Sequence, residues 1–334
     1  MAVNQEFWRE LEKLNQLFLR DYELYGHVDT SIINAEDIDR ATKEGCERVV
    51  ESVVASLTSG ECPVLRVPRS HRRDVFYENV WLYGTQSTLD RAAEDLSRLL
   101  GVPRRGLHLT ATGKGLVAGS LAYTTHDGTT IDVSQAQQGM LVPECVQGLS
   151  GVASEARYIL VVEKDATFQK LVEAQFHRSF GPAVFITGKG YPDLLTRQLV
   201  FRLWAELRVP VLALTDADPY GLHIAAIYKF GSLAREEPGL AVPSLAWLGV
   251  LPSDLPALQL PAHALLPLTP TDHGKLATLA AHPLVSKCPA WLQQIHDQQK
   301  SGYKAEIQSL THIAQDYLTS FYIPSKIRQG GWIT

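Results

Sequence analysis

Three acidic residues follow short apolar runs and are the first candidates for chemistry. Asp216 and Asp218 come just after residues 211–214, and Glu163 directly follows the run YILVV. Such runs are typical of buried parallel strands, whose carboxyl ends meet at one edge of a sheet. Carboxylates gathered there repel each other unless a cation joins them, so the pattern predicts a Mg²⁺ site of the kind used for phosphoryl transfer. The alternative for the Asp-x-Asp pair is a cap on the following helix.

A tyrosine in the segment 72–86 is a second candidate. Tyr77 follows a basic cluster and precedes an expected helix. A phenol with a pKa near 10 is only about 0.1% ionised at neutral pH, so a nucleophilic tyrosine needs a nearby cation. Arg73 is one helical turn away. Considered alone, Tyr77 fits a packed aromatic better than a nucleophile, since the chain has 12 tyrosines.

The segment GKGYPDLLTR, residues 188–197, suggests a phosphate site. Gly188, Lys189 and Gly190 lead into a helix expected to start near Pro192, where exposed amides, a helix N-terminus and a lysine would meet a phosphate. The signal is weak by itself because the full P-loop spacing is missing.

Composition indicates an ordinary soluble globular protein. The chain has 334 residues, enough for two domains, with 45% hydrophobic and 20% charged residues. No apolar run approaches the roughly 18 to 20 residues of a membrane span, and we expect no signal peptide. The four cysteines show no C-x-x-C spacing, which favours a reducing compartment and argues against zinc.

Charge is distributed unevenly along the chain. The formal net charge is −5, but residues 1–61 carry 13 acidic and 6 basic residues. Two later segments have basic residues and no acid: residues 62–73 (Arg66, Arg69, Arg72, Arg73) and residues 96–126 (Arg98, Arg104, Arg105, Lys114). Local basic surface of this kind neutralises phosphates whatever the total charge; the alternative is solvated loop arginines.

These elements divide the chain into three expected segments. Residues 1–61 form acidic helices, at about 5–25 and 35–57, which either cover the next domain or dock a partner protein. Residues 62–150 contain a helix at 87–100, with Leu89, Ala92 and Ala93 on its apolar side, a strand at 107–112 and a hairpin at 120–134. Helices followed by a hairpin predict a winged-helix domain that contacts DNA.

Residues 151–334 alternate between strands and helices and predict an α/β fold with a βαβ sheet. The strands are expected at 157–163, 182–187, 210–215 and 243–249. The tail from residue 252 is rich in proline until a final helix near residues 303–322. We assign no chemical role to the closing segment IPSKIRQGGWIT.

Three motifs in one order now point to a family: RDVFY, then VVEKDATF with GKGYPDLLTR, then LTDADPYG. Together they closely resemble the A subunit of DNA topoisomerase VI and its eukaryotic relative, the transesterase that makes meiotic double-strand breaks. The likeness covers about residues 66–260, with a weaker echo at SKIRQGGWI, and is stronger to the meiotic branch.

The resemblance implies a winged-helix domain followed by a Toprim Rossmann-like domain that binds Mg²⁺. It makes Tyr77 the nucleophile and Arg73 its transition-state or phosphate-binding partner. Glu163, Asp216 and Asp218 become the metal ligands. Lys114 and Lys189 become candidate phosphate contacts and Tyr191 a candidate for stacking on a base or sugar. Asp165 is left out of the metal set.

By resemblance, Tyr77 attacks double-stranded DNA and leaves a 5′-phosphotyrosyl end, in a nuclear homodimer whose sites each combine one protomer's tyrosine with the other's metal. The partners are meiotic accessory proteins and a B-like subunit. The enzyme class is that of ATP-hydrolysing type IIB topoisomerases, although exchanging one ester for another needs no ATP. The alternatives are a topoisomerase VI A subunit that reseals DNA, a Toprim nuclease or primase with a structural Tyr77, and a catalytically silent DNA-binding or scaffold protein.

Overall fold

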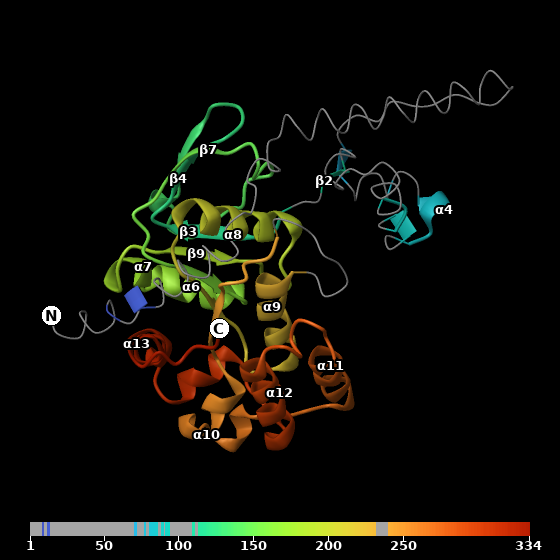
Figure 1. Cartoon of the computed structure of the whole chain (residues 1–334). Helices are drawn as coiled ribbons and strands as arrows, with labels where there is room; N and C mark the ends of the chain where they lie inside the picture. The colour runs from blue at the N-terminus through green and yellow to red at the C-terminus, as the bar shows by residue number, and fades with distance from the viewer. Residues whose placement is uncertain are drawn as a thin grey trace, which may run out of the picture. The chain divides into compact units, whose positions relative to one another are not determined.

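The structure is a computed structural model that describes residues 9, 12–13, 70–71, 77, 80–85, 88–89, 91–93, 109–110, 113–231 and 240–334. The chain separates into two compact units (Figure 1). One unit comprises Met1–His27 and Gly113–Thr334, and the other comprises Val28–Thr112.

A six-stranded sheet forms the centre of the larger unit. Its strand order is β11-β10-β8-β9-β3-β6. The first four strands are parallel, and β3 and β6 are added antiparallel at one side. These strands are β3 (Leu116–Gly119), β6 (Met140–Leu141), β8 (Ile159–Val162), β9 (Val184–Thr187), β10 (Val211–Leu214) and β11 (Ala246–Gly249). The predicted α/β sheet is confirmed.

The apolar runs become strands because helices cover them. All four residues of β8, β9, β10 and β11 are buried, as expected for parallel strands between helical layers. In Figure 1, α8 lies above and α6 and α7 lie below the strands labelled β3 and β9. The helices are α6 (Asp165–Glu173), α7 (Phe176–Ser179), α8 (Leu194–Leu207) and α9 (Pro219–Phe230).

The region after β11 differs from the prediction of one final helix. Two helices begin at prolines, α11 (Pro270–Ala280) and α12 (Pro289–Ser301), because the first helical position needs no amide donor. Residues 303–322 form no single helix. They contain β13 (Tyr303–Lys304), a 3₁₀ helix at Ile307–His312 and a π-helical turn at Leu318–Tyr322, so that prediction is wrong.

Shorter elements complete this region. They are α10 (Leu255–Leu258), β12 (Leu266–Pro267), α13 (Ile323–Arg328), and 3₁₀ turns at Pro252–Asp254 and Ala262–Ala264. Strand β12 pairs with β13. The closing segment, to which the sequence assigns no chemical role, returns to the sheet: Ile333 forms an antiparallel bridge to Trp247 on β11.

The predicted hairpin is present as β4 (Ala122–Thr124) and β5 (Thr130–Asp132), with β7 (Ser150–Ala153) on the other side of β4. Gly128, with φ +83°, supplies the left-handed residue that its turn requires. A 3₁₀ turn at Val133–Gln135 follows. These strands cluster with the larger unit, and β3 extends the main sheet. Residues expected in the winged-helix segment therefore pack with the α/β sheet.

Within the smaller unit, β1 (Ser70–His71) pairs in parallel with β2 (Leu109–Thr110), and α4 spans Val80–Tyr83. Residues 88–89 and 91–93 are helical. Leu89 and Ala93 are buried as predicted, whereas Ala92 is exposed. The remainder of the expected winged helix, and most of the expected N-terminal helices, fall outside the described residues. Arg9, Glu12 and Lys13 are helical and exposed.

In the part of the chain that the structure describes, no helix combines the length and the hydrophobicity of a membrane span. Cys145 and Cys288 are free thiols.

Candidate active site

Two neighbouring strands deliver the predicted carboxylates to one edge of the sheet. β8 and β10 pair in parallel with Val162 opposite Leu214, so both strands end at the same level. Glu163 donates its N–H to the Leu214 carbonyl (3.0 Å) and continues the pairing by one residue. Glu163 and Asp216 are then 7% and 3% exposed, which places two acidic side chains in the interior.

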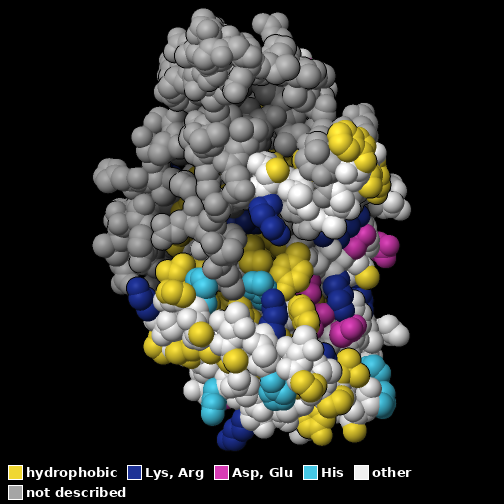
Figure 2. All heavy atoms as spheres, turned by 90° about the vertical axis from the view of Figure 1, so that its right-hand side faces the viewer, with side chains coloured by type: hydrophobic (Ala, Val, Ile, Leu, Met, Phe, Trp, Pro, Cys, Tyr) yellow, Lys and Arg dark blue, Asp and Glu magenta, His cyan; other side chains and the backbone are white. Residues whose placement is uncertain are grey.

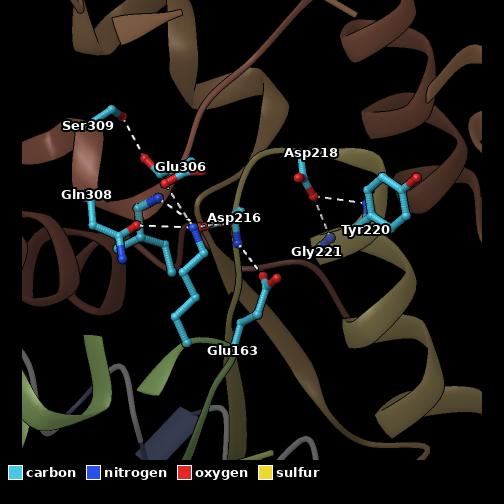
Figure 3. Close-up of polar contacts among 10 residues, drawn as sticks. Glu163, Asp216, Asp218, Tyr220, Gly221, Glu306, Gln308 and Ser309 are labelled. Carbon is cyan, nitrogen blue, oxygen red and sulfur yellow. Dashed lines mark hydrogen bonds and ion pairs between the residues drawn. The ribbon is translucent and has the colours of Figure 1, made fainter. Parts of the chain in front are cut away.

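Asp216 is held from three directions (Figure 3). Its N–H donates to Glu163 Oε2 (2.8 Å), its Oδ1 accepts from the N–H of Ile307 (2.8 Å), and its Oδ2 pairs with Lys164 Nζ (2.9 Å). The neighbouring Ala217 forms a backbone bridge with Ala305. The Asp-x-Asp loop is therefore fixed by a segment about ninety residues further along the chain.

Asp218 caps the N-terminus of α9. Helix capping was the alternative to metal binding for the Asp-x-Asp pair. Its Oδ1 accepts the N–H groups of Tyr220 (2.9 Å) and Gly221 (2.6 Å) (Figure 3). A Cβ on Gly221 would lie 2.3 Å from the Asp216 carbonyl oxygen and 3.0 Å from Glu163 Oε2. Only glycine allows the first turn of α9 to approach the two buried acids so closely.

Burial and mutual repulsion shift the titration of these acids. Burial raises the pKa of Glu163, and the Asp216 and Asp218 carboxylates raise it further. Burial also raises the pKa of Asp216, which the Ile307 N–H and the Lys164 ammonium oppose, and that of Asp218, which the Gly221 N–H opposes. All three groups are therefore costly to ionise without a nearby cation.

The donor set fits a hard divalent cation. Carboxylate oxygens are the ligands that Mg²⁺ prefers, and a cation would offset the repulsion between these acids. In the described residues, no three acidic, histidine or cysteine side chains converge as they stand into a metal cluster. Instead the Lys164 ammonium neutralises Asp216, so Lys164 supplies the positive charge at this edge.

The residues around Lys164 were missed by the sequence analysis. Lys164 Nζ also pairs with Glu306 Oε2 (2.9 Å) and donates to Gln308 Oε1 (3.4 Å). No motif marks residues 305–308, which the sequence pattern places inside a final helix. The one signal was the position of Lys164 itself, directly after Glu163.

The two lysines predicted to contact phosphates lie together. Lys114 Nζ donates to the Lys189 carbonyl (3.1 Å), and Lys189 Nζ pairs with Asp165 (3.2 Å). Asp165, which is not in the predicted metal set, therefore has a different partner. Tyr191 follows in the same loop and donates or accepts a hydrogen bond with His223 Nδ1 (2.8 Å).

The amides of this loop do not form the predicted phosphate seat. The N–H of Lys189 donates to Thr187 Oγ1 (3.1 Å) and that of Gly190 to the Glu163 carbonyl (2.8 Å). Asp193 caps α8, where its Oδ1 accepts from Thr196 N and its Oδ2 accepts from Lys114 N. A carboxylate thus occupies the helix N-terminus, and the lysine side chains are the part of the predicted seat that carries positive charge.

Tyr77 belongs to the smaller unit, Val28–Thr112, and Arg73 lies outside the described residues. Tyr77 is helical and its side chain is 70% exposed. The pairing of a tyrosine nucleophile with Arg73 stays a prediction.

Comparison with known proteins decides the family. The family model that describes the Toprim domain of the topoisomerase 6 A subunit/Spo11 proteins matches residues 158–327, about half of the chain, including all three carboxylates. The chain belongs to the Spo11/topoisomerase 6 A-type family. A second model, type IIB DNA topoisomerase, matches residues 67–109, which include Tyr77.

Several members of the Spo11/topoisomerase 6 A-type family are similar over 78% of the chain. Meiotic recombination protein SPO11 of Mus musculus is 43% identical and that of Homo sapiens 44% identical over 264 residues, which is 67% of each relative. The A3 subunit of DNA topoisomerase 6 from Oryza sativa subsp. indica is 39% identical over 265 residues, 60% of its length. Both matched models describe A-type or topoisomerase domains, and they give no support for ATP hydrolysis by this chain.

Proposed function

We propose that this protein is a topoisomerase-like DNA transesterase that makes double-strand breaks for meiotic recombination. The observation that carries the proposal is the pair of buried acids, Glu163 and Asp216, at the ends of β8 and β10, with Asp218 two residues further along. They occur in a chain that is more than 40% identical to two meiotic recombination proteins. Buried acids at one edge of a sheet, with pKa values raised by burial and by neighbouring carboxylates, are typical of functional sites.

In this proposal Tyr77 is the nucleophile and Arg73 stabilises the charge that develops on the phosphate. The Tyr77 oxygen bonds to phosphorus as the bond from phosphorus to the 3′ oxygen of the neighbouring deoxyribose breaks. Tyrosine loses its proton and the departing 3′ oxygen gains one, which leaves a 5′-phosphotyrosyl end and a 3′ hydroxyl. The step is reversible because one phosphodiester replaces another.

Glu163, Asp216 and Asp218 would hold Mg²⁺ in this proposal. When bound, Mg²⁺ neutralises charge on the scissile phosphate and the neighbouring backbone. For Asp216 to bind the cation, Lys164 would give up its ion pair with Asp216 Oδ2 and keep that with Glu306. Lys114 and Lys189 contact backbone phosphates, and Tyr191 stacks on a base or sugar.

The remaining parts of the proposal concern assembly. Residues 62–150 form the winged-helix domain that bears Tyr77, and two copies of the chain form a two-fold dimer in the nucleus. A double-strand break needs two tyrosines, which a two-fold dimer provides. The partners are meiotic accessory proteins and a B-like subunit. Any ATP hydrolysis is assigned to that B-like protein.

A second candidate is a topoisomerase VI A subunit that reseals the DNA. The similarity to the DNA topoisomerase 6 A-type proteins of Oryza sativa and Arabidopsis thaliana, at 39% and 36% identity, favours it to a lesser degree. Relaxation of supercoiled DNA in the presence of a B subunit would distinguish the two functions.

The test is covalent capture of DNA. The full chain is incubated with Mg²⁺, plasmid and its partner proteins, quenched in denaturant and treated with protease, with Tyr77→Phe beside it. We expect linear or nicked plasmid with peptide on the 5′ ends, and none with Tyr77→Phe. Cutting that survives in Tyr77→Phe would assign the chemistry to metal-activated water and refute the transesterase.

The acidic segment 5–57 is the proposed docking site for a partner protein. Deleting it should abolish partner binding in a pull-down and leave duplex DNA binding within about twofold, because this segment is negatively charged and repels phosphates. Loss of both activities would contradict this role.

A further inference from the structure

A cluster of aromatic and cationic side chains lies beside the carboxylates, on residues that have no assigned role apart from Tyr191. It consists of Tyr191 in the GKGY loop, Tyr220 and His223 on α9, and Lys275 on α11. The Lys275 ammonium lies 5.6 Å from the ring centre of Tyr191 and 5.4 Å from that of Tyr220. Lys275 Nζ is also 2.5 Å from His223 Nδ1.

Both segments that bear the aromatic rings are tied to the acidic edge. Tyr220 donates its N–H to Asp218, and His223 lies on the same face of α9 one turn later. Tyr191 follows Gly190, whose N–H donates to the Glu163 carbonyl. The cluster therefore has a fixed position relative to the three carboxylates.

The cluster carries one positive charge. Burial and the neighbouring cation Lys275 lower the pKa of His223 to about 4, so its imidazole is neutral near pH 7 and accepts a hydrogen bond at Nδ1. Among the described residues, Lys275 forms no ion pair with a carboxylate. The acid one turn earlier on its helix, Asp272, is already bound to Lys304 (2.6 Å).

Within the part of the chain that the structure describes, the half-buried Lys275 ammonium has no acidic partner, and its place between two tyrosine rings suits an anion that carries an aromatic or sugar group. Tyr191 and Tyr220 keep 38% and 37% of their surface exposed. On the face that carries α9 and α11, Figure 2 shows basic, histidine and hydrophobic side chains gathered beside acidic ones. Phosphates and stacked bases are the groups of a DNA strand that cationic and aromatic side chains of this kind bind.

We propose that Lys275, held by Tyr191, Tyr220 and His223, binds a backbone phosphate of the DNA strand next to the acidic edge. Lys275 makes the ionic contact, and the two rings and the imidazole orient it. The inference rests on the proposed function, because it takes DNA as the ligand.

The test measures binding of a fluorescent duplex oligonucleotide to the full chain in the Tyr77→Phe background, without Mg²⁺, at several salt concentrations. Lys275→Ala should weaken binding about five- to tenfold at low salt and reduce the slope of log affinity against log salt by about 1, the loss of one phosphate contact. Lys300→Ala, which removes an exposed lysine from the end of α12, is the charge-matched control. Lys275→Arg should retain most of the affinity.

Coupling within the cluster gives a second measurement. Tyr220→Ala should weaken binding in the Lys275 parent and have less effect in Lys275→Ala, since the ring acts by orienting the lysine. Equal affinity and equal salt slope for Lys275→Ala and Lys300→Ala would overturn the phosphate site while leaving the proposed function intact. Failure of the Tyr77→Phe parent to bind DNA would overturn both.

Discussion

Glu163, a proposed metal ligand, is expected to oppose the stability of the folded protein while no cation is bound. Burial and the Asp216 carboxylate raise the pKa of Glu163 to about 8, so near neutral pH folding without a cation requires protonation of a carboxyl that is ionised in the unfolded chain. Replacing Glu163 with Gln removes this cost, while the amide oxygen can still accept the Asp216 N–H. We expect Glu163→Gln to raise the free energy of unfolding in EDTA by on the order of 1 kcal/mol. Adding Mg²⁺ should raise the Tm of the parent protein and not that of the variant, because a ligand stabilises the state that binds it.

Calorimetry or thermal fluorescence measures this effect, with Glu173→Gln, an exposed acid in α6, as the control. A variant that is less stable than the parent in EDTA would mean that the carboxylate is not under electrostatic strain.

We predict that replacement of glycine by alanine has opposite effects on stability at Gly221 and at Gly274. Gly221→Ala places a methyl group 2.3 Å from the Asp216 carbonyl oxygen, so α9 must shift. We expect the free energy of unfolding, measured in urea, to fall by about 1–3 kcal/mol. Gly274, inside α11, has nothing within 4 Å of the added methyl group. Gly274→Ala should therefore stabilise the protein by about 0.5–1 kcal/mol. Similar effects at both positions would contradict the close approach.

An ion pair between buried Asp272 on α11 and partly exposed Lys304 on β13 joins these two elements. Burial acts to raise the pKa of Asp272, but hydrogen bonds from Lys304 and Thr269 outweigh burial and hold the pKa below its ordinary value. A lowered carboxyl pKa stabilises the fold above the unfolded value, near pH 4, and this contribution disappears as the pH falls through the folded value.

Asp272→Asn should therefore lower the free energy of unfolding by about 1.5–3 kcal/mol at pH 7. The difference from the parent should shrink as the pH falls below the unfolded value, near pH 4, in urea titrations. Lys304→Met should remove most of this pH dependence. A difference that stays constant with pH would assign the effect to packing.

The sequence predicts the sheet and its acidic edge well because both depend on local patterns. Runs such as residues 211–214 are apolar throughout, and parallel pairing then brings Glu163 and Asp216 to the same edge. The 305–308 segment was not predictable, since its position depends on backbone pairing with Ala217 across nearly ninety residues. The prolines that open α11 and α12 were misinterpreted because proline both breaks helices and begins them.

For the whole molecule, the proposed sharing of sites between two protomers predicts complementation. A mixture of Tyr77→Phe and Glu163→Gln proteins forms dimers in which one shared site has an intact tyrosine and an intact acidic edge, while the other site lacks both. We expect nicked plasmid with 5′-linked protein from the mixture and none from either variant alone. Sites confined to single protomers would leave the mixture inactive, as would the absence of a dimer.

The hydrogen bond from the Ile307 N–H to Asp216 Oδ1 also has a consequence for folding during protein synthesis. Asp216 is added to the nascent chain 91 residues before Ile307, whose amide holds its carboxylate. The acidic edge therefore cannot adopt its final geometry on a nascent chain, although β8, β9 and β10 are already available to fold. A translation product that stops before residue 307 would contain every proposed catalytic residue and still lack the support for Asp216.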